Sequence, residues 1–262
     1  MSPPDPWQDL RRLTAARIAL GRSGVSLPTA EWLRLAEAHA MARDAVHTAL
    51  DAAALCDALV LDGLEAVCVH SAAPDRAAYL RRPDLGRRLA PAGAARLAAL
   101  AVAEAPPLVV VMADGLSAAA VACHGLPLLR ALRPRLAAQQ QALGRVVVAQ
   151  QARVALGDEI GSLLRAQAVL VLVGERPGLS SPDSMGAYLT WAPRIGRLDA
   201  ERNCVSNIRP EGLGTDQAAH KIAWLLDAAR SLRTTGLALK DASDTSSLPG
   251  APQGGPWPQV SR

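Results

Sequence analysis

The spacing of apolar residues divides the chain into two parts. Up to residue 63, apolar residues recur at helical spacing, as in the stripe that includes Trp32, Val46 and Leu50. This periodicity predicts helices over residues 10–20, 30–50 and 52–61. From residue 64 onward, short β-type runs alternate with helical patterns. Residues 1–63 are therefore expected to form a small all-helical domain.

Six short apolar runs predict strands in the second part. The runs Leu108 to Met112 and Ala168 to Val173 are continuous, which is typical of strands buried on both faces. The other strands are expected at residues 64–69, 145–149, 188–191 and 204–208. Helical patterns separate most of these runs. The chain is therefore predicted to be an α/β protein, with a mainly parallel sheet and helices on both faces over residues 64–240.

Prolines, glycines and serines mark the predicted breaks. The helical region after residue 113 is expected to be interrupted at Gly125-Leu126-Pro127 and again at Pro134, because proline removes a backbone donor. A last helix is predicted from Thr215 to about Thr234. Residues 241–262 are rich in Ser, Pro and Gly and show no periodicity, so a disordered tail is expected there.

Composition excludes several classes of protein. Lys and Arg number 28 against 24 Asp and Glu, and the arginines are scattered, so no nucleic-acid partner is expected. The four Cys and five His form no ligand motif, which predicts no metal site. No apolar run is long enough to span a membrane and no signal pattern opens the chain. We therefore expect a cytoplasmic protein with reduced thiols and no membrane contact.

The loops after the predicted strands carry the candidate chemistry, because ligands of parallel sheets bind beyond the carboxyl ends of the strands. The loop of residues 174–184 follows the most apolar strand and contains two Gly, two Pro and three Ser. We expect it to form part of a ligand site. Simpler interpretations are a turn at Asp114-Gly115, first-turn helix acids at Asp158-Glu159 and a surface ion pair at Glu175-Arg176.

Familiar motifs are missing from these loops. The sequence contains no GxGxxG after the first strand, no GxxxxGK[ST] and no GxSxG, so the usual NAD, P-loop and α/β-hydrolase fingerprints do not apply. Cys204 has no histidine placed beside it by the sequence, which makes it a poor nucleophile.

Five segments together resemble a known family. They are RRPDLGRRL at 81–89, DGLS at 114–117, GDEIG at 157–161, GERPGL at 174–179 and NCVSNI at 203–208. In this order they resemble the small (light) subunit of ethanolamine ammonia-lyase, from about residue 10 to residue 229. The resemblance implies a carbon–nitrogen lyase that converts ethanolamine to acetaldehyde and ammonia with adenosylcobalamin. It also implies a large TIM-barrel partner subunit that holds ethanolamine and is required for activity.

The same resemblance implies an arrangement of the site. A helical N-terminal domain would precede a Rossmann-like cobalamin-binding domain at residues 64–240, which holds the lower face and nucleotide tail of the cofactor between the subunits. The family's contact positions fall on Val154, Glu175 and Cys204. No catalytic residue and no metal ligand are implied in this chain. A DxHxxG motif is absent, so the cofactor is expected to keep its own base on cobalt.

Some family members carry a longer N-terminal extension that directs them into a bacterial microcompartment. Here the matching region begins almost at Met1, so enclosure in such a shell is expected to depend on the partner. Two other functions stay open on the sequence alone. One is an α/β enzyme that uses another nucleotide, such as NAD. The other is an adaptor that stabilises a partner without binding cobalamin.

Overall fold

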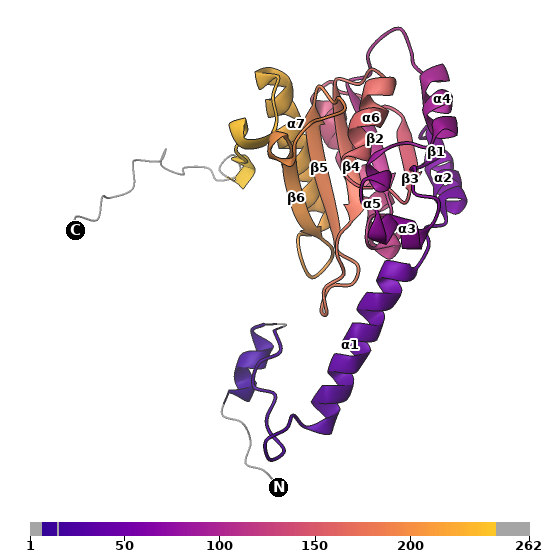
Figure 1. Cartoon of the computed structure of the whole chain (residues 1–262). Coiled ribbons are helices and arrows are strands. Elements are labelled where there is room, and N and C mark those ends of the chain that lie inside the picture. The colour runs from indigo at the N-terminus through magenta and orange to yellow at the C-terminus, as the bar shows by residue number, and fades with distance from the viewer. Residues whose placement is uncertain (1–6, 15, 245–262) are drawn as a thin grey trace, which may run out of the picture.

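A six-stranded mixed sheet forms the centre of the molecule (Figure 1). The computed structural model describes residues 7–14 and 16–244. The strand order is β1-β3-β2-β4-β5-β6. The strands are β1 (Ala66–His70), β2 (Leu108–Ala113), β3 (Val146–Gln150), β4 (Ala168–Gly174), β5 (Met185–Trp191) and β6 (Asn203–Ile208).

Strands β1, β3, β2 and β4 are parallel, whereas β5 is antiparallel to both of its neighbours. The prediction of a mostly parallel sheet is therefore confirmed, with one reversed strand. The reversal follows from the connection, because a parallel crossover needs a dozen or more residues and usually a helix. Residues 175–184 contain no helix, so β5 returns beside β4 as a hairpin.

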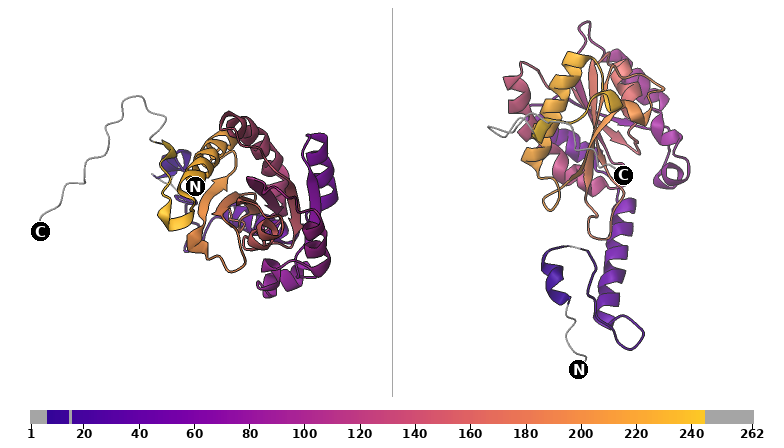
Figure 2. Two further views of the ribbon diagram at one scale, coloured as in Figure 1. Left: turned by 90° about the horizontal axis from the view of Figure 1, so that it is seen from above. Right: turned by 90° about the vertical axis from the view of Figure 1, so that its left-hand side faces the viewer.

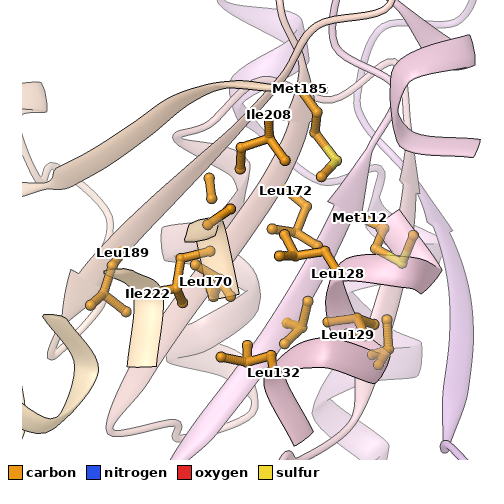
Figure 3. Close-up of a cluster of buried hydrophobic side chains, with 14 of the residues drawn as sticks. Met112, Leu128, Leu129, Leu132, Leu170, Leu172, Met185, Leu189, Ile208 and Ile222 are labelled. Carbon is orange, nitrogen blue, oxygen red and sulfur yellow. The ribbon is translucent and has the colours of Figure 1, made fainter. Parts of the chain in front are cut away.

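Helices cover both faces of the sheet (Figure 2). One face packs against α2 (Ala52–Leu61), α5 (Ala118–Ala138) and α7 (Thr215–Leu232), and Figure 3 shows part of this core around Leu128, Leu172 and Ile222. The other face packs against α4 (Pro91–Ala99) and α6 (Leu156–Leu163). The remaining elements are α1 (Thr29–His47), α3 (Arg76–Arg81) and short 3-10 turns at Gln8–Arg12, Leu85–Arg87, Asp199–Glu201 and Gly236–Ala238.

The cover on the α4 and α6 side is incomplete. The apolar cluster on that side is built from strands β1 to β4, and Tyr188 of β5 packs at its border. Beyond that border Cys204 of β6 is exposed. On this side the described residues contribute no side chain of β6 to the cluster, and α6 reaches β6 through the buried contact of Asp158 with Arg202. A surface next to the carboxyl end of β4 is therefore left open.

The predicted breaks in α5 are wrong. The helix runs unbroken from Ala118 to Ala138 with Pro127 and Pro134 inside it. Each internal proline costs about 3 kcal/mol. Leu128, Leu129 and other side chains along the same helix are fully buried in the core, and each buried leucine contributes about 2 kcal/mol. Tertiary packing thus overrides the local preference.

The N-terminal helices differ in how they pack. The helix predicted at residues 10–20 is wrong, because the described residues of this stretch form only the 3-10 turn at Gln8–Arg12. Leu13 is 82% exposed, and a short helix without burial is marginal in water. Helix α1 projects from the sheet (Figures 1 and 2), and its Trp32 side chain is exposed. Helix α2 instead places Leu59 in the core. The domain boundary at residue 63 stays a prediction.

The expectation of reduced thiols is wrong for one pair. Cys56 of α2 and Cys68 of β1 form a disulfide, while Cys123 and Cys204 are free. The helix–turn–strand path between them folds α2 back onto β1, a contact that the spacing in sequence does not reveal. In the described part of the chain no helix is long and apolar enough to cross a membrane. Residues 245–262 of the predicted tail lie outside the described residues.

Candidate functional site

The loops after β2 and β4 touch each other through their backbones. Leu116 N–H donates to the Gly174 carbonyl over 2.9 Å. A Cβ atom on Gly174 would lie 2.0 Å from the Ser117 carbonyl oxygen and 2.7 Å from that of Asp114. Glycine is therefore required at the end of β4 because two backbones meet there. The first residue of the predicted ligand loop is fixed in place by this contact.

Asp114 joins the loop after β2 to the loop after β3. Its buried carboxylate accepts hydrogen bonds from the backbone N–H groups of Gln151 and Ala152, at 2.8 and 2.9 Å. The guanidinium of Arg76 lies 3.7 Å away. Burial raises the pKa of Asp114, although the two backbone hydrogen bonds oppose that shift. Asp114 is thus more than a turn residue, because it orients the segment that leads to Val154.

Two arginines flank one aromatic ring beside this segment. The guanidinium carbons of Arg76 and Arg153 lie 4.7 and 4.6 Å from the ring centroid of Tyr79. Arg76 Nη2 and Arg153 Nε are buried without a hydrogen-bond partner among the described residues, and cation–π attraction to the ring compensates them in part. Burial raises the pKa of Tyr79 to about 12. No local sequence pattern predicts this cluster, because its members come from separate segments.

Glu175 connects the hairpin loop to β6. Its carboxylate accepts a hydrogen bond from the Ser184 hydroxyl and another, at 3.3 Å, from the backbone N–H of Asn207. The Glu175 side chain has room because Gly186 has no side chain. A Cβ atom there would lie 2.9 Å from Glu175 Oε1 and 3.1 Å from the ring of Tyr188. Glu175 is therefore held by the loop and the sheet together, and within the described residues it binds Ser184 and Asn207 and forms no ion pair with Arg176.

Cys204 and Tyr188 lie side by side on the open surface. They are direct partners in the β5–β6 ladder, and side chains of directly opposed residues share a face of the sheet. Although Cys204 as a residue is exposed, partial shielding of its thiol from solvent raises the thiol pKa, and the hydrogen bond with Tyr188 opposes the shift. Burial also raises the pKa of Tyr188. Glu175, Tyr188 and Cys204 define what we call the β5–β6 surface.

The start of α6 borders this surface. Val154 precedes the helix and packs against the same apolar cluster as Tyr188. Asp158 and Glu159 lie in the first turn of α6, as the sequence suggested, and both also bind distant partners. Glu159 accepts from Arg88 and from the backbone N–H of Leu89. Asp158 forms a buried ion pair with Arg202, with distances of 2.6 and 2.7 Å.

Comparison with known proteins identifies the family. The family model of the ethanolamine ammonia-lyase light chain matches residues 4–240. The chain belongs to this family. A small subunit of ethanolamine ammonia-lyase from Azotobacter vinelandii is 53% identical over 95% of this chain and 93% of its own length. Those from Pseudomonas aeruginosa and Xanthomonas campestris are 51% and 53% identical, over 96% and 92% of this chain and 93% and 90% of their own lengths.

The ethanolamine ammonia-lyase light chain is a subunit of a carbon–nitrogen lyase, as the sequence motifs predicted. In this light chain Glu175 and Cys204 lie close together at the β5–β6 surface, and Val154 packs against the same apolar cluster as Tyr188. Their role in binding a cofactor stays a prediction. Sequence reasoning missed Tyr188, although it falls in the predicted fifth strand, because its neighbours depend on the β5–β6 register. Among the described residues no three His, Cys, Asp or Glu side chains gather as a metal site.

The raised pKa of Cys204 predicts slow alkylation of this light chain. An ordinary cysteine has a pKa of about 8.5, so the pH midpoint for reaction of Cys204 with iodoacetamide should lie above that value. Rates at Cys204, followed by mass spectrometry across pH 7 to 10, provide the measurement. The same cysteine in the urea-unfolded chain is the control. A folded midpoint at or below the unfolded one would contradict this description of the site.

Proposed function

We propose that this light chain binds adenosylcobalamin at the β5–β6 surface. The bound cofactor then faces a large subunit that holds ethanolamine, and the complex converts ethanolamine to acetaldehyde and ammonia. The observation that carries the proposal is the placement of Glu175, whose carboxylate is fixed by Ser184 and Asn207 next to a part of the sheet without helical cover. Family membership supplies the reaction class.

The chemistry of these residues fits the cofactor. The lower side of a cobalamin offers amide and ribose donors together with an apolar base. A carboxylate has about four acceptor positions, and Glu175 uses two of them within the chain, so it keeps capacity for ligand donors. The ring of Tyr188 adds apolar surface beside it, and Val154 adds apolar surface on the cluster that Tyr188 borders. The Cys204 thiol, whose pKa is raised by its surroundings, adds a small neutral surface.

In this proposal the light chain binds and orients but carries out no bond-breaking step. When bound, adenosylcobalamin supplies the radical chemistry. Glu175 accepts hydrogen bonds from the ligand, and Val154 and Tyr188 exclude water from one side of it. Asp114 and Gly174 keep the loops that bear these side chains in one arrangement. The isolated chain is accordingly expected to be inactive toward ethanolamine.

Removing the Glu175 side chain tests the proposal. Glu175→Ala in the assembled two-subunit complex should raise the Kd for adenosylcobalamin about tenfold or more, because a hydrogen bond to a charged group contributes roughly 1.5–3 kcal/mol. Equilibrium titration of the purified complex gives the value. Glu211→Ala is the matched control, since Glu211 is exposed and pairs only with nearby Arg209 in the described structure.

The same titration separates the other two functions. Normal assembly of Glu175→Ala with unchanged cofactor affinity would favour an adaptor that does not bind cobalamin. Saturable binding of NAD, with no binding of cobalamin by the complex, would favour an enzyme that uses another nucleotide. Deamination of ethanolamine by the isolated chain with cofactor would contradict the assignment as a dependent subunit.

A further inference from the structure

The buried ion pair between Asp158 and Arg202 joins helix α6 to the residue before β6. Both side chains are only 2% exposed. Each carboxylate oxygen of Asp158 accepts from a different terminal nitrogen of Arg202, at 2.6 and 2.7 Å. This is the bidentate geometry that fixes two side chains both in distance and in orientation.

Every donor of the Arg202 guanidinium is used. Besides the two bonds to Asp158, Nη1 donates to the Thr190 hydroxyl at 3.0 Å and Nη2 to the Arg197 carbonyl at 3.0 Å. Nε donates to Asp199 at 3.4 Å. An arginine has five N–H donors, so the side chain has one satisfied arrangement and no spare bond. Such a group specifies geometry, whereas its net contribution to stability is often small compared with apolar side chains of similar volume.

The pair lies directly beside the β5–β6 surface. Side chains two residues apart on a strand point to the same face, so Thr190 follows Tyr188 and Arg202 precedes Cys204 on one face of the ladder. Tyr188 and Cys204 are register partners, and Thr190 and Arg202 are hydrogen-bonded one step further along both strands. Thr190 and Arg202 thus belong to the same row of side chains as Tyr188 and Cys204, and they form its buried end.

The other end of the pair leads to Val154. Asp158 lies in the first turn of α6, four residues after Val154. Val154 packs on the cluster that Tyr188 borders. A displacement of α6 relative to β6 would change the separation between Val154 on one side and Tyr188 and Cys204 on the other. In the described structure the Asp158–Arg202 pair is the buried ionic link between these two elements.

We infer that Asp158 and Arg202 are positioning residues that set the width of the cofactor site between α6 and the β5–β6 surface. The inference rests on the proposed function. Neither side chain is accessible to a ligand, so the pair acts through Val154, Tyr188 and Cys204. It therefore controls how tightly the cofactor binds and leaves the chemical step to other groups.

The test replaces the pair by apolar side chains of similar size. In the two-subunit complex, Asp158→Leu/Arg202→Met should raise the apparent KM for adenosylcobalamin about tenfold and leave kcat at saturating cofactor within twofold. Arg202→Lys keeps the charge but cannot form both parallel bonds, and we expect a smaller increase of about threefold. Because Arg202→Lys keeps a buried charge pair, it tests the inference even if the apolar variant does not fold.

The control is the ion pair of Arg145 with Glu65, which precedes β3 and β1 on the other side of the sheet from β6 and whose side chains are 22% and 75% exposed. Glu65→Leu/Arg145→Met should leave the KM for the cofactor unchanged. A purely structural role for Asp158–Arg202 would lower kcat per total protein, through loss of folded complex, at an unchanged KM, and would overturn the inference.

Glu175→Ala, measured in parallel, distinguishes a failure of the positioning role from a failure of the proposed function. If Glu175→Ala raises the KM for adenosylcobalamin while both variants of the ion pair leave it unchanged, the positioning role is wrong and the proposed function stands. If neither Glu175→Ala nor the ion-pair variants change the KM, the cofactor binds elsewhere and the proposed function fails with the inference.

Discussion

Replacing Gly174 with alanine is expected to lower the free energy of unfolding by about 3 kcal/mol, the upper part of the range for overpacked sites. The added Cβ atom would stand 2.0 Å from the Ser117 carbonyl oxygen and 2.6 Å from its carbon. These are backbone atoms, so no side-chain rotation relieves the contact. Urea unfolding followed by circular dichroism measures the change.

Gly93→Ala is the control for that experiment. Gly93 lies inside α4, and a Cβ atom there would be 3.5 Å from the nearest atom of Val69, an ordinary contact. Because alanine is favoured over glycine in a helix by roughly 0.5–1 kcal/mol, this variant should be neutral or slightly more stable. Equal stability of both variants would show that the loops after β2 and β4 separate easily, and that Gly174 is not required by their contact.

Replacing Asp114 with alanine is expected to have an effect of similar size. The carboxylate accepts from two backbone N–H groups and lies 3.7 Å from Arg76. Its loss leaves buried donors without an acceptor and a largely buried arginine without its counter-charge. We expect a decrease in unfolding free energy of about 3 kcal/mol. Chemical denaturation is again the measurement, and faster amide exchange at Gln151 and Ala152 should accompany it.

Asp84→Ala is the control for Asp114→Ala, because it removes an exposed carboxylate instead of a buried one. Asp84 forms an exposed ion pair with Arg82, at 2.7 Å, with side chains 59% and 62% exposed. Exposed pairs contribute about 0–1 kcal/mol, so the control should unfold almost as the natural chain does. If Asp114→Ala were equally mild, the loop that leads to Val154 would have to be held by other contacts, such as that of Arg153 N–H with the Gly86 carbonyl.

Much of the fold was predictable because buried strands appear in the sequence as continuous apolar runs. The continuous apolar runs of β2 and β4 predict central strands, and every residue of both strands is buried. Helix α5 was predicted with breaks because its prolines are visible in sequence, whereas the core that holds it together is assembled from the whole sheet. The reversal of β5 depends on the missing crossover helix between Gly174 and Met185, a sign that is present in the sequence.

The site was predictable only where a loop carried it. The loop of residues 174–184 stands out because it is polar and follows the most apolar strand, whereas Glu175, Val154 and Cys204 were singled out by the family resemblance. The pairing of Asp158 with Arg202 joins residues 44 positions apart. No periodicity or motif relates such positions, because the register of β6 and the seating of α6 decide the contact. Long-range pairs of this kind emerge only from the folded structure.

The contact between the ends of β2 and β4 also limits how a large ligand can enter. Asp114 ties the loop after β3 to this contact, and Leu116 ties the end of β4 to it. Because these contacts involve backbone atoms, no side-chain rotation can loosen them, and the three loops are expected to move as one unit. An entry path between these loops would require breaking the hydrogen bonds that join them. If the proposed function holds, a ligand as large as adenosylcobalamin is therefore expected to arrive from the uncovered side, across β5 and β6.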